Sequence, residues 1–279
     1  MITIAELLRG SGIDVIDAID ARVLLRAVLG VNDATLIAHS DDAVTAQHAS
    51  QFRALAARRA AGEPVAYLVG EREFYAQVFK VTPAVLIPRP ETELLVELAL
   101  QRLPRDAARR VLDLGTGSGC SAISIAAARP SSRVTAVDQS EQALLLASEN
   151  ATRLGARNVT LHSSNWFDAV CGERYPHYDL IVSNPPYVAA GDAHLAQGDL
   201  RYEPVSALTS GADGLADIRV IVAGARAHLA PGGWLLFEHG YDQAQRCREL
   251  LSQAGFAEVR SWRDLAGIER VSGGVNPQV

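Results

Sequence analysis

The stretch Val111 to Cys120, VLDLGTGSGC, joins a predicted strand to a predicted helix through a glycine-rich turn. The apolar run before the turn is typical of a buried strand, and small residues follow it. Gly115, Gly117 and Gly119 permit positive φ angles and a close approach of a ligand to the backbone. Many nucleotide-binding sheets have such a turn, so by itself it predicts either a ligand site or a tight structural connection.

Outward from this turn, predicted strands and helices alternate along the chain. The strands are expected at 109–115, 133–138, 158–163, 178–184, 234–240, 257–262 and 268–274. The helices between them are expected at 120–130, 140–155, 215–233 and 242–256. Alternation of this kind predicts an α/β fold, in which a mainly parallel seven-stranded sheet is covered on both faces.

Residues 1–70 have apolar residues at helical spacing and predict a small helical-bundle domain. Gly30 is expected to end one helix there, and Ser40 to begin the next long one. Residues 71–90 mix aromatic, β-branched and turn residues and predict a hairpin linker. Residues 91–279 then form the α/β domain. Its stretch 189–214 is a long loop and therefore a candidate functional element.

Composition limits the class of protein. The chain has 279 residues and a formal net charge of -6, which disfavours a broad nucleic-acid surface. No apolar run approaches the roughly 20 residues of a membrane helix. Glu6 and Arg9 interrupt any signal peptide, so we expect a cytoplasmic protein. Cys120, Cys171 and Cys247 form no CxxC pair, and no metal site is expected.

Two features of the glycine turn and the next strand favour a ribose-containing ligand. The spacing G-x-G-x-G differs from the dinucleotide pattern G-x-G-x-x-G, and no G-K-[ST] of a P-loop follows. Asp138 ends the second strand 19 residues after Gly119, close to the roughly 20 expected of a ribose-binding acid. The alternative role, a helix cap, is already available from Ser140.

Asn165 and Trp166 follow the third strand, where Trp166 can stack on a purine and Asn165 can hydrogen-bond to it. Without a dinucleotide pattern, these residues favour S-adenosylmethionine over NAD, because a sulfonium needs no phosphate cradle. The predicted cofactor-binding residues are Gly115, Thr116, Gly117, Ser118, Gly119, Asp138, Asn165, Trp166 and Asn184.

The fourth strand ends in Asn184-Pro185-Pro186-Tyr187. Since proline cannot donate a ladder hydrogen bond, sheet pairing stops here. The Asn184 side-chain oxygen and the Pro185 carbonyl can each accept one N–H of a planar NH2 group, and Tyr187 can pack on the flat face of that group. Such an amine is a poor nucleophile, so orientation beside a methyl donor is the expected source of catalysis. Asn184, Pro185 and Tyr187 are the predicted catalytic residues, and Pro186 completes the predicted substrate site.

The segments DLGTGSG, AVD, NWF, SNPPY and LLFEHG resemble those of class I S-adenosylmethionine-dependent methyltransferases, whose fold is Rossmann-like. With LIPRPETE (Leu86 to Glu93) and RYEPVSAL (Arg201 to Leu208), the chain resembles the HemK/PrmC family, the protein-(glutamine-N5) methyltransferases of peptide chain release factors. Asn165 departs from the Asp that is usual in this family.

The resemblance implies methylation of the glutamine in the release factors' Gly-Gly-Gln motif, with the release factor as partner and the N-terminal domain in substrate recognition. A monomer without direct nucleic-acid or membrane contact is expected. A glutamine methyltransferase of a ribosomal protein, a nucleic-acid amino-methyltransferase and an adenosine-binding regulatory module remain alternatives. Arg201 and Glu203 are either a solvated pair or part of a peptide groove. Arg89 and Glu91 either fasten the linker or border the active site.

Overall fold

The computed structural model describes residues 2–9, 16–170 and 177–278. The chain folds into two compact units. The first consists of Met1–Glu71 and His194–Tyr202, and the second of Arg72–Ala193 and Glu203–Val279.

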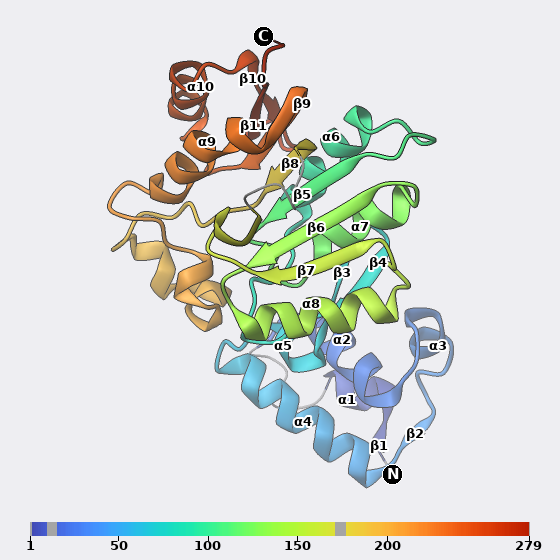
Figure 1. The fold of residues 1–279 in the computed structure, drawn as a ribbon. Helices are drawn as coiled ribbons and strands as arrows, with labels where there is room; N and C mark the ends of the chain where they lie inside the picture. The colour runs from blue at the N-terminus through green and yellow to red at the C-terminus, as the bar shows by residue number, and fades with distance from the viewer. Residues whose placement is uncertain (1, 10–15, 171–176, 279) are drawn as a thin grey trace. The chain divides into compact units, whose positions relative to one another are not determined.

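The second unit is built on a seven-stranded sheet with the order β10-β11-β9-β8-β5-β6-β7 (Figure 1). Its strands are β5 (Arg110–Leu114), β6 (Arg133–Asp138), β7 (Val159–Ser163), β8 (Tyr178–Ser183), β9 (Leu229–Glu238), β10 (Ala257–Arg263) and β11 (Glu269–Val275). The last two strands run antiparallel to their neighbours, while β7, β6, β5, β8 and β9 are mutually parallel. The predicted α/β class and mainly parallel sheet are confirmed.

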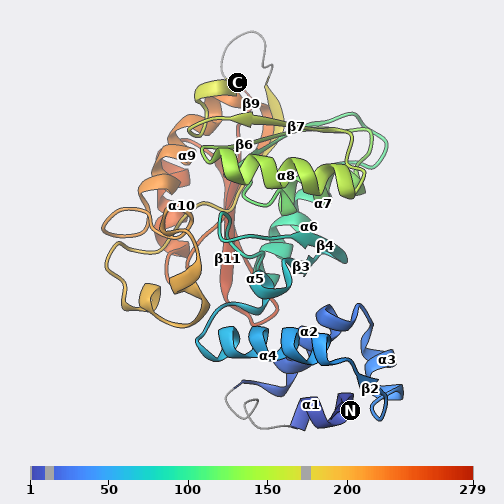
Figure 2. The ribbon, with the colours of Figure 1, turned by 90° about the horizontal axis from the view of Figure 1, so that it is seen from below.

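Helices cover both faces of this sheet (Figure 2). On one face lie α6 (Glu93–Arg102), α7 (Cys120–Ala128) and α8 (Glu141–Arg153), and on the other α9 (Ala216–His228) and α10 (Ala244–Gln253). Side chains alternate along β8, so Leu180 and Val182 are buried under the first layer and Ile181 under the second. Two apolar faces explain why the central strands β5 and β8 are mostly apolar, whereas the edge strand β10 is largely polar and partly exposed.

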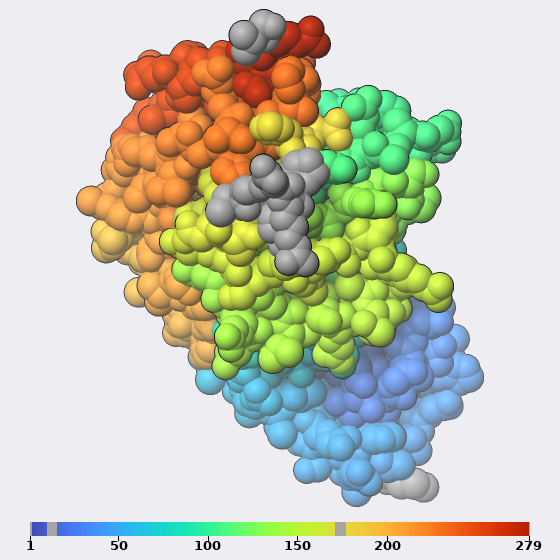
Figure 3. Space-filling view, in the orientation of Figure 1, coloured from blue at the N-terminus to red at the C-terminus, as the bar shows by residue number. Residues whose placement is uncertain are grey.

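Helix α8 begins at the N-cap Ser140, whose hydroxyl accepts from the backbone N–H of Ala143 at 3.2 Å. Its inner side buries Leu146 and Ala147, while Leu145 is exposed. The helix forms part of the surface of the second unit in the space-filling view (Figure 3). Thus α8 is a one-sided amphipathic helix, as its sequence predicts.

Gly119 permits close packing between α7 and α8. Its φ is +81°, and an added Cβ would lie 2.8 Å from Ile123 Cδ1 and 3.2 Å from Ala147 Cβ. We expect Gly119→Ala to lower the free energy of unfolding by roughly 2–4 kcal/mol, from overpacking and the left-handed backbone together. Gly155→Ala is the matched control: its φ is +70°, but nothing lies within 4 Å of the added Cβ. Urea unfolding of both ligand-free variants checks this, and an equal loss would contradict the packing argument.

The predicted hairpin is present as β3 (Glu71–Phe74) and β4 (Gln77–Lys80). It is not a free linker, however, because Phe74 and Phe79 are buried in the core of the second unit. Asn150 on α8 also fixes it: the backbone N–H of Lys80 donates to Asn150 Oδ1 at 2.8 Å, and Asn150 Nδ2 donates to Lys80 O at 3.0 Å. From Arg72 onward the hairpin is therefore part of the second unit.

The first unit is mainly helical. It contains α1 (Ile4–Arg9), α2 (Ala18–Leu29), α3 (Asp33–Ala38), α4 (Ala46–Ala60), α5 (Val65–Val69) and the short strands β1 (Ile2–Thr3) and β2 (Ala43–Val44). Leu24, Leu25 and Phe52 are buried at its core. Gly30 ends α2 as expected. The prediction that Ser40 begins the long helix is wrong: Thr45 caps α4, because the residues before it pair with β1.

The segment His194–Tyr202 groups with the first unit, although the sequence-based division placed it in 91–279. Asp199 accepts from Arg59 Nη1 at 3.2 Å. Arg201 Nη2 and the Tyr202 hydroxyl both donate to the carbonyl of Ala61, at 2.8 and 2.9 Å. These contacts within the unit are long-range in sequence, so no local pattern signals them.

The structure differs from the prediction at the boundary between α9 and β9. Helix α9 ends at His228, and β9 begins at Leu229, so the predicted helix end at 233 is wrong. The irregular pairing of β9 with β8 between Tyr178 and Leu180 accommodates the Pro-Gly-Gly stretch within the strand. No helix in the described part of the chain is long and apolar enough to span a membrane.

Candidate active site

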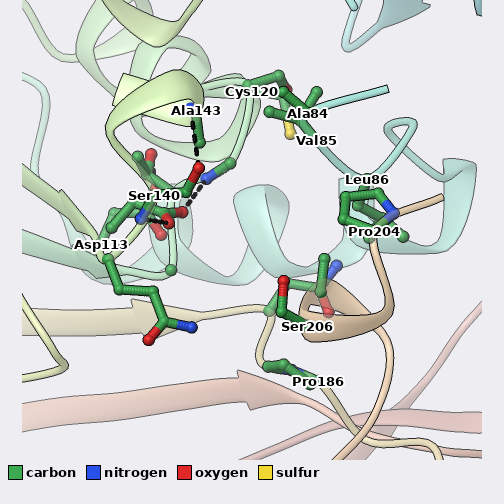
Figure 4. Close-up of a pocket in the computed structure, with 18 of the residues that line it drawn as sticks. Ala84, Val85, Leu86, Asp113, Cys120, Ser140, Ala143, Pro186, Pro204 and Ser206 are labelled. Atoms are coloured by element: carbon green, nitrogen blue, oxygen red, sulfur yellow. Dashed lines mark hydrogen bonds between the residues drawn. The ribbon is translucent and has the colours of Figure 1, made fainter. Parts of the chain in front are cut away.

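A cavity of about 510 Å³ lies in the second unit, at the carboxyl ends of β5, β6, β7 and β8. The strand order reverses between β5 and β8, which is the position where open α/β sheets bind ligands. Figure 4 shows Asp113 and Ser140 on one side of the cavity and Pro204 and Ser206 on the other. Its volume lies within the range typical of small-molecule sites.

The glycine turn forms one wall of this cavity. Gly115 and Gly117 have φ angles of +72° and +55°, and the backbone N–H groups of Gly115 and Thr116 donate to Val137 O at 2.9 Å each. An added Cβ at Gly117 would meet nothing within 4 Å, so space for a ligand adjoins it. The turn is therefore held by its backbone and open to the cavity.

Asp138 is oriented toward the cavity by two backbone donors. Gly117 N–H donates to Oδ2 and Ser140 N–H donates to Oδ1, both at 2.9 Å. Each carboxylate oxygen has further acceptor capacity. The side chain lines the cavity and so fits the role of accepting from two ribose hydroxyls.

Asn165 and Trp166 also line the cavity. Trp166 has a φ of +50°, an uncommon conformation for a bulky residue. Ser164 supports it, since its hydroxyl donates to Trp166 O at 2.9 Å and accepts from Ala169 N at 3.0 Å. The indole lies 3.5 Å from the Cβ that Gly115 lacks. Backbone strain at an aromatic residue that lines a cavity is typical of a functional site.

Asp113 lies one residue before the end of β5, and its place in a predicted strand gives no sequence signal of a site residue. It is buried and lines the cavity, and the Thr116 hydroxyl donates to its Oδ2 at 2.7 Å. Burial raises the pKa of Asp113 to about 6. A perturbed carboxyl group in a cavity is a candidate contact for a cationic ligand.

The NPPY corner places an unpaired acceptor at the cavity. Asn184 and Pro186 line it. Asn184 Nδ2 donates to the Thr92 hydroxyl at 3.1 Å, while Asn184 Oδ1 is buried and has no hydrogen-bond partner among the described residues. A buried unpaired acceptor is costly unless a ligand satisfies it.

The structure does not bring all predicted site residues to the cavity. Within the described residues, Gly119, Pro185 and Tyr187 are absent from its lining. Tyr187 does not face it as expected: its hydroxyl donates to Glu238 Oε1 at 3.0 Å, and its ring packs against the apolar layer under α9 and α10. The negative charge of Glu238, followed by burial, raises the pKa of Tyr187. Tyr187 therefore supports the corner.

Thr92 and Glu238 were also missed, although the motifs PRPETE and EHG contain them. The Thr92 hydroxyl donates to Glu238 Oε2 at 2.7 Å, and both side chains are buried. Burial raises the pKa of Glu238 to about 7, against the two hydroxyl hydrogen bonds that lower it. The sequence signals Thr92 and Glu238 only through their motifs, which occur together with NPPY in this chain. The contact between the two side chains depends on the tertiary structure.

Glu203 and Arg89 join two walls of the cavity. Glu203 is buried, pairs with the Arg89 guanidinium and accepts from the backbone N–H of Ile87 at 3.2 Å. Of the two alternatives for Arg201 and Glu203, a solvated pair or part of a peptide groove, the burial of Glu203 argues against the first. The linker segment that carries Pro88 and the loop that carries Pro204 both line the cavity, so this ion pair holds them together.

We expect Arg89→Met to destabilise the protein by about 3 kcal/mol, because it removes the counter-charge of a buried carboxylate. Adding Glu203→Gln should restore part of this loss. Lys80→Met is the matched control, since the Lys80–Glu149 pair is about half exposed and worth under about 1 kcal/mol. Thermal unfolding measures all three. A loss for Arg89→Met no larger than that for Lys80→Met would contradict this role.

The described residues contain no group of His, Cys, Asp and Glu side chains that could hold a metal ion. Cys120 and Cys247 are free thiols, and burial raises the pKa of each to about 12. Cys171 lies outside the described residues.

The strand order, the glycine turn, the Asp138 carboxylate in the cavity and the NPPY corner together define a class I S-adenosylmethionine-dependent methyltransferase. Two family models match the chain: the PrmC N-terminal domain over residues 3–70 and the methyltransferase small domain over 91–212. The chain belongs to the release factor glutamine methyltransferases, as its similarity to curated relatives shows.

The release factor glutamine methyltransferase of Bordetella pertussis is 56% identical over 92% of this chain and 94% of its own. The protein of the same name from Burkholderia pseudomallei is 52% identical over 99% and 96%. Among solved structures, a methyltransferase from Pyrococcus furiosus aligns with a TM-score of 0.55 at 18% identity, over 74% of this chain and 91% of that one. This last similarity shows the fold alone.

Proposed function

We propose that the chain transfers a methyl group from S-adenosylmethionine to the side-chain amide nitrogen of the glutamine in the Gly-Gly-Gln motif of peptide chain release factors. The observation that carries this proposal is the unpaired oxygen of Asn184, which is buried at the cavity with its NH2 group already engaged. A glutamine NH2 group is the donor that satisfies it.

The amide nitrogen is a weak nucleophile because its lone pair is delocalised into the carbonyl group. When bound, S-adenosylmethionine supplies an electrophilic methyl carbon, and the N–C bond forms as the C–S bond breaks and its electrons return to sulfur. Asn184 Oδ1 accepts from one N–H group of the glutamine and so aims the lone pair of the glutamine nitrogen. The alkylated nitrogen then releases one proton to water. Orientation of this kind supplies up to about 7–11 kcal/mol of a barrier.

The cofactor-binding role of the cavity rests on its walls. Asp138 accepts from the ribose hydroxyls, Trp166 stacks on the adenine, and Asn165 accepts from its amine. The glycine turn, together with Thr116 and Ser118, lies along the remaining part of the bound S-adenosylmethionine. The open space beside Gly117 and the fixed orientation of Asp138 support this placement.

The first unit recognises the release factor in this proposal, and the chain acts as a cytoplasmic monomer without direct nucleic-acid contact. The match of residues 3–70 to the PrmC N-terminal domain supports the first point, and the net charge of -6 supports the last. Light scattering during size-exclusion chromatography measures the oligomeric state.

The test incubates the chain and labelled S-adenosylmethionine with purified release factor, either wild type or with the glutamine of the motif changed to alanine. Label is expected on the wild-type factor alone. Equal labelling of both would refute the glutamine assignment. Ribosomal protein and RNA fractions serve as competing substrates, and preferential labelling of either would favour the corresponding alternative.

A further inference from the structure

We propose that Thr92 and Glu238 are positioning residues that fix which end of the Asn184 amide faces the substrate. This inference rests on the proposed function, because it assigns a reason for the orientation of the group that accepts from the glutamine. The two residues act through Asn184, and Glu238 does not line the cavity among the described residues.

The Thr92 hydroxyl has a single proton, and Glu238 Oε2 accepts it in a hydrogen bond at 2.7 Å. A hydroxyl has one proton and two lone pairs, so Thr92 Oγ1 can offer only a lone pair to Asn184. The amide of Asn184 must therefore turn its NH2 group toward Thr92, at 3.1 Å, and its oxygen toward the cavity.

Glu238 determines the direction of this chain of hydrogen bonds. As a carboxylate, Glu238 can only accept hydrogen bonds. It accepts one from the Thr92 hydroxyl at 2.7 Å and one from the Tyr187 hydroxyl at 3.0 Å. Once protonated, Glu238 has a proton of its own to donate. Thr92 can then accept a hydrogen bond from Glu238 and donate its own proton to Asn184 Oδ1. The Asn184 amide can therefore rotate, so that its NH2 group, which cannot accept, faces the NH2 group of the substrate.

The surroundings of Glu238 favour the carboxylate only partly. Tyr187 and Thr92 face it with hydroxyl groups, the charge of Arg270 stabilises its anion, and the charge of Glu91 and burial oppose it. The pKa of Glu238 is raised to about 7. The directed arrangement is thus complete above this pH and is lost as the pH falls through it.

Two variants at Thr92 test the chain of hydrogen bonds from Glu238 through Thr92 to Asn184 with little change in side-chain volume. Thr92→Val keeps the volume and removes the hydroxyl, and we expect kcat to fall roughly 10- to 100-fold. Thr92→Ser keeps the hydroxyl and should restore kcat to within about threefold of wild type. Both variants should bind S-adenosylhomocysteine by calorimetry within about threefold of wild type, because Asp138 and the glycine turn are untouched.

Glu238→Gln adds a readout that a purely structural role would not move. In the wild type, kcat should decline below about pH 7 with an acidic limb, because Glu238 takes up a proton. An amide does not titrate, so this limb should disappear in Glu238→Gln. A limb that persists unchanged would assign it to another group, such as Asp113, and would overturn the role of Glu238.

The outcomes separate this inference from the proposed function. If wild-type chain fails to label the release factor, the proposed function fails. If wild type labels it but Thr92→Val and Thr92→Ser have the same kcat, or Thr92→Val equals wild type, the positioning role is overturned. A fall in cofactor affinity that parallels the fall in kcat would likewise overturn it.

Discussion

Asn184→Ala is expected to lower kcat by roughly 10²–10³-fold, the loss typical of removing one preorganised hydrogen-bonding group from an active site. The substitution deletes the acceptor for the glutamine NH2 group and leaves the nucleophile without a fixed direction. The rate of methyl transfer to purified release factor, measured at saturating cofactor, checks this expectation.

Two measurements control this prediction. The affinity for S-adenosylhomocysteine should change less than the rate does, since Asp138 and the glycine turn are untouched. The free energy of unfolding should not fall, because the variant also removes a buried acceptor that has no partner among the described residues. Turnover within a few-fold of wild type would show that Asn184 does not hold the substrate amide.

Asp138→Ala is expected to weaken S-adenosylhomocysteine binding by roughly 100-fold or more. Loss of two hydrogen bonds to a charged acceptor amounts to about 3 kcal/mol, and the backbone donors of Gly117 and Ser140 lose their partner as well. Calorimetric titration of the wild type and the variant measures the change.

Asp106→Ala is the matched control for that titration, since Asp106 is exposed and lies outside the cavity lining. It should leave the affinity within about twofold, because an exposed substitution away from the site changes little. Equal effects of Asp106→Ala and Asp138→Ala would mean that net charge, and not ribose contact, governs binding.

The sheet was predictable because its signals are local. The central strands β5 and β8 are apolar runs that end at turn residues, and Gly30 and Ser140 act as the helix boundaries that their types suggest. Thr45 replaced Ser40 as a cap for a non-local reason, the pairing of β2 with β1. The grouping of His194–Tyr202 with the first unit likewise depends on contacts far apart in sequence.

The residues of the candidate site also divide into those that the local sequence predicts and those that it does not. The glycine turn, Asp138 and Asn184 follow strand ends, and parallel strands bring their carboxyl ends to one edge, so their proximity could be predicted. The roles of Thr92, Glu203 and Glu238 could not, because each depends on a partner more than 90 residues away in the chain. Burial, which raises the pKa of Glu238, is also a property of the folded state alone.

The most direct test of the account is a crystal structure of the chain with S-adenosylhomocysteine and a peptide containing Gly-Gly-Gln. We predict the glutamine NH2 group at about 3 Å from Asn184 Oδ1, with Asn184 Nδ2 still donating to Thr92 and the cofactor ribose on Asp138. A glutamine amide bound elsewhere, or an Asn184 amide that turns its oxygen toward Thr92, would contradict it.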